Sequence, residues 1–192
     1  MKNYLVLGFA LISFLVKAQE VQEVSVEKNL NSVQLGLLSL SFQNETRLER
    51  KITLRSEIGL ASGTSTKEYS DDHKETSFLI VPFVNLEPRW YYGLDRRSRL
   101  KKRTANNSSN YVSLLTTFVS SKTALVNTKD FTVAPYIAIT PEYGLRRASK
   151  HFYLEYSAGV GYKHNFLDNS YRYSFDANEL NIDFQFKIGY IF

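Results

Sequence analysis

Histidine is the side chain best suited to proton transfer and metal binding near neutral pH, and this 192-residue chain has three. A divalent cation could bind a group made of His73, Asp71, Asp72 and Glu75. His151 and His164 are far away in sequence and show no metal-ligand spacing. A solvated acidic loop is the simpler interpretation of the first group. We therefore predict no metal and no other cofactor.

Nucleophilic catalysis would require Ser70, Asp72 and His73 to form a triad. Neighbouring loop residues rarely adopt that geometry, and no nucleophile elbow accompanies them. The chain contains no cysteine, which excludes a cysteine nucleophile, a thiolate metal site and a disulfide framework. We predict that the protein is not an enzyme.

Charged residues recur on the polar side of segments whose apolar residues occupy alternate positions. In a strand, such a pattern places the charges together on one face. Opposite charges and small residues on one face could fill a narrow interior with ion pairs, or they could form a solvated surface. The set consists of Arg55, Glu57, Glu87, Arg89, Glu142, Glu155, Asp183 and Lys187.

A basic run lies between positions 95 and 110, and its members are Arg96, Arg97, Arg99, Lys101, Lys102 and Arg103. Such a run could contact anionic headgroups, bind nucleic acid or form a solvated connector. No aromatic residue is interleaved with these side chains, which argues against nucleic acid as a partner. The connector is the simplest interpretation, and headgroup contact is the functional hypothesis.

Strands must position these residues, because apolar side chains alternate with polar ones along most of the chain. The clearest segment is 179–192, and the same period of two occurs over 151–163, 131–146, 38–45 and 51–60. Two further segments, at 78–92 and 111–119, alternate less regularly. Together with the five clearer segments they make seven predicted strands. Closed antiparallel barrels of bacterial chains have an even number of strands, so we expect an eighth within 24–37.

The predicted fold is therefore all-β, an antiparallel up-and-down transmembrane β-barrel of about eight strands. Short connections at 46–50 and 147–150 alternate with long ones at 62–76, 120–130 and 165–178. In such barrels, short turns face the periplasm and long loops face outward. The basic connection at 95–110 is the exception, because a tight turn is usual on its side.

The first eighteen residues have the features of a secretory signal peptide. Lys2 precedes an apolar run over 4–16, and Val16 and Ala18 have the small-residue spacing of a cleavage site. A membrane anchor would need roughly 20 apolar residues, and Lys17 ends this run too early. We expect a signal peptide at 1–18, a lead-in segment at 19–30 and the barrel at 31–192.

Which face points inward decides between two classes of barrel. A soluble, lipocalin-like carrier would enclose an apolar ligand with its apolar face, whereas a membrane barrel turns that face to lipid. Aromatic residues such as Trp90, Tyr92 and Tyr143 fall near predicted strand ends on the apolar face. Aromatic side chains gather there at the two membrane interfaces, which favours the membrane barrel.

The chain ends in FQFKIGYIF, with Phe184, Phe186, Ile188, Tyr190 and Phe192 at alternate positions. This resembles the carboxyl-terminal signal of Gram-negative outer-membrane barrel proteins, which the barrel-assembly machinery recognises. The chain as a whole resembles the small OmpA-type and OmpX-type barrels and the Bacteroidota-type outer-membrane β-barrel proteins, in which segments like EPRWYYGLDRR and LRSEIGL are familiar. The resemblance implies location in the outer membrane, with outer-membrane lipid and the assembly machinery as partners.

We expect a structural or surface-interaction role for a monomeric barrel in the cell envelope. About eight strands leave an interior only just wide enough for side chains, so the charged set is expected to fill the lumen. The long outer loops are where an extracellular ligand would bind. The alternatives are a narrow porin-like pore for small solutes, an outer-membrane lipid-modifying enzyme, or the soluble carrier.

Overall fold

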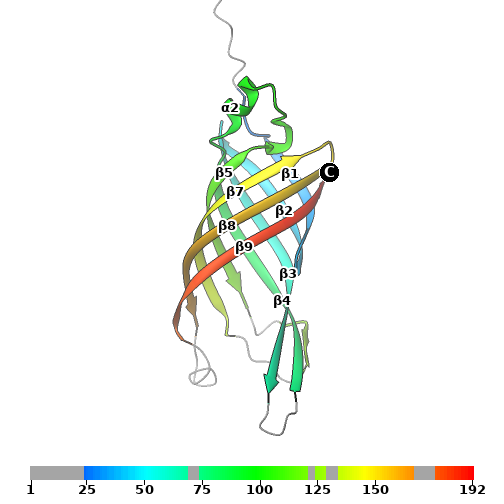
Figure 1. Cartoon of the computed structure of the whole chain (residues 1–192), viewed down its shortest axis with the longest axis vertical. Helices are drawn as coiled ribbons and strands as arrows, with labels where there is room; N and C mark the ends of the chain where they lie inside the picture. Colours follow the sequence, from blue (N-terminus) through cyan, green and yellow to red (C-terminus); the bar gives the residue numbers. More distant parts are fainter. Residues whose placement is uncertain (1–23, 69–73, 121–123, 129–133, 167–175) are drawn as a thin grey trace, which may run out of the picture.

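The structure, a computed structural model, describes residues 24–68, 74–120, 124–128, 134–166 and 176–192. Its antiparallel strands close into an eight-stranded barrel (Figure 1), which confirms the predicted all-β barrel. Among the described residues, no helix is both long and apolar enough to cross a membrane. The barrel strands are β1 (Asn29–Gly36), β2 (Ser39–Glu49), β3 (Ile52–Glu68), β4 (Lys74–Trp90), β5 (Asn110–Val119), β7 (Tyr136–Ala148), β8 (Phe152–Asn165) and β9 (Asn178–Ile191).

Each strand pairs with the next one around the ring, and β9 closes the ring against β1 with Tyr190 opposite Val33. The expected eighth strand is β1, which lies within the predicted segment 24–37. A further short strand, β6 (Val126–Asn127), pairs with β4 at Leu79 and Ile80, beyond the end of β5. The predicted strand 131–146 corresponds to β7, which begins at Tyr136. Residues 129–133 lie outside the described part of the chain.

The alternation of side chains divides the barrel into an apolar outside and a polar inside. Phe184 and Ile182 on β9 are 82% and 71% exposed, whereas Arg55 on β3 is 1% exposed. A water-soluble domain shows the opposite arrangement, because burial of apolar area is what stabilises it. The polar face is therefore the inner face, as the membrane-barrel interpretation requires.

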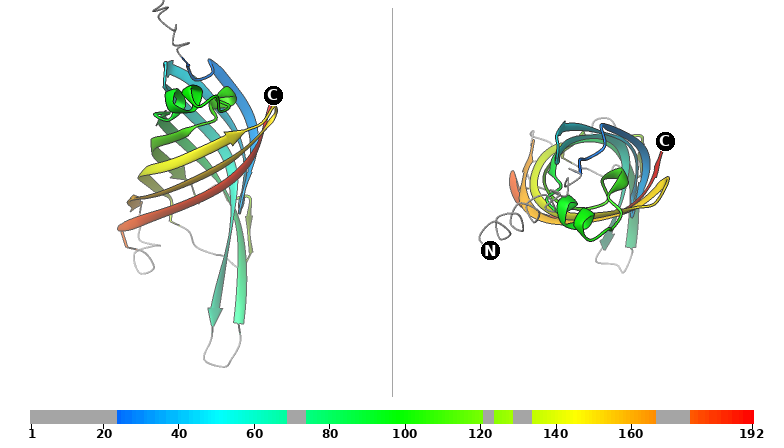
Figure 2. Two further views of the ribbon diagram at one scale, coloured as in Figure 1. Left: turned by 45° about the horizontal axis from the view of Figure 1, so that its top comes forward. Right: turned by 90° about the horizontal axis from the view of Figure 1, so that it is seen from above.

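One end of the barrel, here called the capped end, is covered by the connection between β4 and β5. This connection contains the helix α2 (Leu94–Arg99) and the 3-10 turn η1 (Ala105–Asn107). Figure 2 shows these segments across the ring when the barrel is viewed from this end, where the carboxyl terminus also lies. The predicted basic turn is thus an ordered cap, in which most of the basic side chains are exposed.

Apolar packing and two asparagines fasten the cap. Leu94 and Tyr91 are fully buried and pack with Val26 from the segment preceding β1. Asn107 Oδ1 accepts a hydrogen bond of 2.8 Å from the Glu27 amide. Asn106 and Asn107 have φ angles of 57° and 58°, a left-handed conformation that asparagine tolerates better than most residues. The cap is therefore part of the folded barrel.

The opposite end, here called the hairpin end, differs from the prediction at its first connection. Strands β3 and β4 are each 17 residues long and stay paired up to Glu68 and Lys74. Most of the predicted long loop 62–76 is therefore an extended hairpin that projects beyond the other strands (Figure 1), and only 69–73 lie outside the described residues. Of the predicted loops 120–130 and 165–178, residues 121–123, 129–130 and 167–175 lie outside the description.

Two inward tyrosines lie against glycines on the neighbouring strand. Tyr111 faces Gly144 and Tyr153 faces Gly189 in the strand register. A Cβ atom on Gly144 would lie 2.2 Å from the Tyr111 ring, and one on Gly189 would lie 2.1 Å from the Tyr153 ring. Both rings are fully or almost fully buried. Glycine is required at both positions because the rings occupy the space of a side chain.

We predict that Gly144→Ala and Gly189→Ala each lower the free energy of unfolding by about 1–3 kcal/mol, the usual cost of overpacking a filled interior. Urea unfolding of the protein folded in detergent micelles would measure the change. Gly63→Ala is the matched control, because its added Cβ meets nothing within 4 Å. Equal stability of all three variants would contradict the tyrosine packing described here.

Candidate functional site: the charged barrel interior

Eight charged side chains form one cluster in the middle of the barrel, and all are at most 6% exposed. Four are basic and four are acidic, so their formal charges balance. A buried charge is tolerated when it is paired and hydrogen-bonded. The cluster consists of Arg55, Arg89, Arg146, Lys187, Glu45, Glu57, Glu87 and Glu155.

Glu155 on β8 is the centre of the cluster, because it contacts all three arginines. Its Oε1 accepts from Arg55 Nη1 at 3.0 Å and from Arg89 Nη2 at 2.8 Å. Its Oε2 accepts from Arg89 Nη1 at 2.9 Å and from Arg146 Nε at 2.7 Å. One carboxylate thus joins β8 to strands β3, β4 and β7.

Towards the capped end, the cluster continues through Arg146 to Glu45. Arg146 Nη1 donates to Glu45 Oε2 at 2.6 Å. The other oxygen of Glu45 accepts from the hydroxyls of Thr53 and Tyr91, each at 2.8 Å, and from Asn107 Nδ2 at 3.0 Å. Asn107 belongs to the cap, so Glu45 ties the cap to the charged interior.

Towards the hairpin end, the cluster continues through Arg55 to Glu57. Arg55 Nη2 donates to Glu57 Oε2 at 2.6 Å, and Lys187 Nζ lies 3.3 Å from the same oxygen. Ser41 donates to Glu57 Oε1 at 2.6 Å, and Asn85 Nδ2 donates to Oε2 at 3.1 Å. Both oxygens of this carboxylate are therefore occupied.

The strand register brings the opposite charges together. Arg55 lies opposite Glu87 and Glu45, and Glu155 lies opposite Arg146 and Lys187. Opposite charges in directly facing positions stabilise a strand pair, and a slip of one residue would turn them to the outer face. Two guanidinium groups also lie over tyrosine rings, Arg89 at 4.2 Å from the Tyr111 centroid and Arg146 at 4.6 Å from that of Tyr153.

Six of the eight charged residues singled out in the sequence belong to this cluster, whereas Glu142 and Asp183 do not. Both accept from Gln185 Nε2, Glu142 at 3.3 Å and Asp183 at 2.7 Å. Glu45 and Arg146 were left out of the predicted set, although Arg146 was placed on the polar face beside Glu142. Their inward positions on β2 and β7 follow from the same alternation, which is the signal that identifies them.

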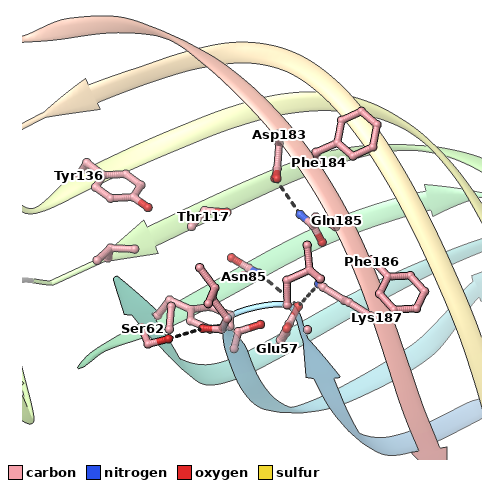
Figure 3. Close-up of a pocket in the computed structure, with 17 residues that line it drawn as sticks. Glu57, Ser62, Asn85, Thr117, Tyr136, Asp183, Phe184, Gln185, Phe186 and Lys187 are labelled. Atoms are coloured by element: carbon pink, nitrogen blue, oxygen red, sulfur yellow. Dashed lines mark hydrogen bonds and ion pairs between the residues drawn. The ribbon is translucent and has the colours of Figure 1, made fainter. Parts of the chain in front are cut away.

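A hollow of about 340 Å³ opens from the cluster towards the hairpin end (Figure 3). Lys187, Glu57 and Asn85 lie at its base, and Asp183, Thr117 and Tyr136 lie farther along its wall. Leu79, Val81, Phe83 and Val119 form an apolar cluster inside the barrel at this end. The interior is therefore layered, with a cap, a charged middle and a partly apolar mouth.

The two histidines that the structure describes lie apart from the charged cluster, each beside a neighbouring aromatic or amide side chain. Ser70, Asp71, Asp72 and His73 lie outside the described residues. His151 stacks on Tyr190 with ring centroids 5.8 Å apart, and His164 lies 2.9 Å from the Asn178 side chain. Within the described ranges, no group of three or more metal-binding side chains occurs.

The five residues of the carboxyl-terminal pattern lie on the outer wall. Phe184, Ile188, Tyr190 and Phe192 are exposed, and Phe186 is partly exposed. Tyr190 packs edge-on against Phe152, with ring centroids 5.2 Å apart, and Phe186 lies 4.9 Å from Tyr156. These side chains therefore form part of an aromatic outer surface.

The fold and the site together define a class, a closed eight-stranded antiparallel barrel with a charge-filled interior and an apolar exterior. Comparison of the chain with protein-family models, with curated proteins and with solved structures finds no match. The chemistry available in the interior is that of charge pairing, because both oxygens of Glu45, Glu57 and Glu155 are already engaged.

We predict that Glu155→Gln lowers the free energy of unfolding by about 3–5 kcal/mol, because it removes the carboxylate that three buried arginines share and leaves one buried positive charge uncompensated. The measurement is the urea midpoint in micelles. Lys163→Gln is the control, since its ion pair with Glu179 is partly exposed and worth at most about 1 kcal/mol. A loss at Glu155 no larger than the loss at Lys163 would refute the central role of this carboxylate.

Proposed function

We propose that this protein is a small barrel that spans the outer membrane of a Gram-negative bacterium and has a structural or surface-interaction role. The single observation that supports this most strongly is the polarity of the wall, apolar outside and charged inside. Burial of the outer face in lipid would remove its apolar area from water, which is the main favourable term available to such a surface.

The aromatic residues support the same placement. Trp90, Tyr92 and Tyr143 lie together on the outer wall near the capped end, with ring centroids 5.9 Å and 6.4 Å apart along the row. Tryptophan and tyrosine are enriched at the level of lipid headgroups, because one part of each ring system is apolar and another is polar. We therefore assign the capped end to one membrane interface, the periplasmic one by the resemblance of the chain.

The alternative functions are weaker on physical grounds. A carrier of an apolar ligand needs an apolar cavity, and the middle of this barrel is filled with paired charges. A pore needs a continuous aqueous path, and here the ion-pair cluster and the cap lie across it. A lipid-modifying enzyme depends on residues near His73, which lie outside the described part of the chain. The hairpin end remains the proposed contact surface for an external ligand.

Membrane insertion predicts opposite environments for two neighbouring phenylalanines. Phe118 on β5 faces outward and lies opposite a valine of β4. Phe83 on β4 faces inward and lies opposite a valine of β5. In a background with Trp90→Phe, we expect Phe118→Trp to be quenched by lipids that carry bromine on their acyl chains and Phe83→Trp to be shielded. Equal quenching of the two, or quenching of neither, would contradict insertion with this polarity.

A filled lumen predicts that the protein conducts no ionic current across planar bilayers. We expect no stepwise conductance from the intact protein, whose folded state is verified beforehand by a shift in gel mobility between unboiled and boiled samples. Loss of the Glu155 carboxylate in Glu155→Ala should raise the frequency of brief openings, because the pairing that closes the interior is broken. Steady channels in the intact protein would favour the pore.

A further inference from the structure

The basic cap forms a second hollow, on the outside of the barrel. This hollow, here called the rim hollow, has a volume of about 380 Å³ and lies between the cap and the outer wall formed by β5 and β7. Four basic side chains and two aromatic ones supply most of its lining. They are Arg96, Arg97, Lys102, Arg147, Tyr92 and Tyr143.

Two of the guanidinium groups are held in place by hydrogen bonds. Arg97 Nε and Nη2 donate to the Arg103 carbonyl at 3.1 Å and 2.9 Å. Arg147 Nη1 donates to the Arg146 carbonyl at 2.8 Å, and its Nη2 donates to Asn110 Oδ1 at 2.7 Å. A guanidinium has five N–H donors, so each group keeps donors for a ligand. Fixed guanidinium groups lose less side-chain entropy when they bind an anion.

The positive charge of the rim hollow has no carboxylate beside it. No Asp or Glu is among the described residues that line it. Asp95 is the acidic residue of the cap segment 91–110, and it pairs with Lys51 and lies 3.7 Å from Arg50. Partial burial and the charge of Arg147 lower the pKa of Arg97, as expected where like charges face one another. A bound anion would relieve this repulsion.

The aromatic side chains set the level at which that anion would lie. Tyr92 and Tyr143 belong to the outer aromatic row, and Asn110 Nδ2 fixes the Tyr143 hydroxyl with a hydrogen bond of 2.7 Å. If the row lies at the membrane interface, as the proposed function requires, the four basic groups lie at the height of lipid phosphates. This step rests on the proposed membrane insertion.

We propose that the rim hollow binds the phosphate group of an anionic phospholipid, with its acyl chains along the outer wall. Arg97 and Arg147 hold the phosphate oxygens through charge-assisted hydrogen bonds, and Arg96 and Lys102 add positive charge. Tyr92 and Tyr143 contact the glycerol region. The cap thus gives the barrel a lipid preference at one interface.

Trp90 makes this testable, because it is the chain's single tryptophan and lies beside Tyr92. In phosphatidylcholine vesicles that contain a minor fraction of brominated lipid, we expect brominated phosphatidylglycerol to quench Trp90 more than brominated phosphatidylcholine does. The preference should fall about thirtyfold in Arg97→Gln/Arg147→Gln, because each basic group near an anionic surface contributes about a fivefold factor. Arg96→Gln/Lys102→Gln should lower the preference as well. Within the described part of the chain, neither of these two side chains makes a hydrogen bond on which the fold depends.

The matched control is Arg99→Gln/Lys101→Gln, which removes the same charge from the cap outside the rim hollow and should keep the preference. An equal loss of the lipid preference in this control would show that the preference comes from general surface charge, and it would overturn the proposal. Abolition of the preference by inorganic phosphate at matched ionic strength would assign the site to soluble phosphate instead of lipid. If neither brominated lipid quenched Trp90, membrane insertion itself would be refuted. That result is distinguishable from loss of the lipid preference alone, in which both lipids still quench.

Discussion

The rest of the structure depends on the pairing of buried charge around Glu155. This carboxylate accepts hydrogen bonds from arginines on three different strands, so it can be satisfied only when β3, β4 and β7 all have their native register against the barrel. A one-residue slip of any of them would carry its arginine to the apolar face and leave the carboxylate underpaired. Buried pairs add little net stability, but the cost of breaking them is high, which makes them suited to selecting one register among several.

The charged interior also explains the outer wall. In the middle of the barrel the inner face of each strand takes the arginines, carboxylates and hydroxyls, and most of the valines, leucines and phenylalanines lie on the outer face. Such a wall is unstable in water, because apolar area without a partner promotes association. Closure removes the sheet edges, and in the proposed membrane location lipid would cover the outer face, so that location would satisfy both demands. The same division of side chains therefore fixes register, closure and the environment in which we place the protein.

Alternation in the sequence was sufficient to predict most strands, and it failed where both faces carry similar residues. Leu79, Val81 and Phe83 point inward yet are apolar, so the first part of the predicted strand 78–92 has no clear polar face. The extension of β3 and β4 into a long hairpin was missed because the segment 62–76 is polar almost throughout and shows no alternation. Glu45 and Arg146 could be assigned to the polar face, but their contact depends on strands distant in sequence. The cap was unpredictable for another reason. Its position depends on Asn106 and Asn107 in left-handed conformations and on burial of Leu94, neither of which has a periodic signal.

The neighbouring residues Arg146 and Arg147 show how the interior and the rim are connected. Successive side chains of a strand point to opposite faces, so Arg146 reaches Glu45 and Glu155 while Arg147 reaches the rim hollow. The Arg146 amide donates to the Ser109 carbonyl at 2.8 Å, and the Arg146 carbonyl accepts from Arg147 Nη1. Glu45 meanwhile holds Asn107 of the cap. The charged interior therefore positions both the outer wall and the cap that form the rim hollow. The proposed lipid site would for this reason depend on ion pairs inside the barrel.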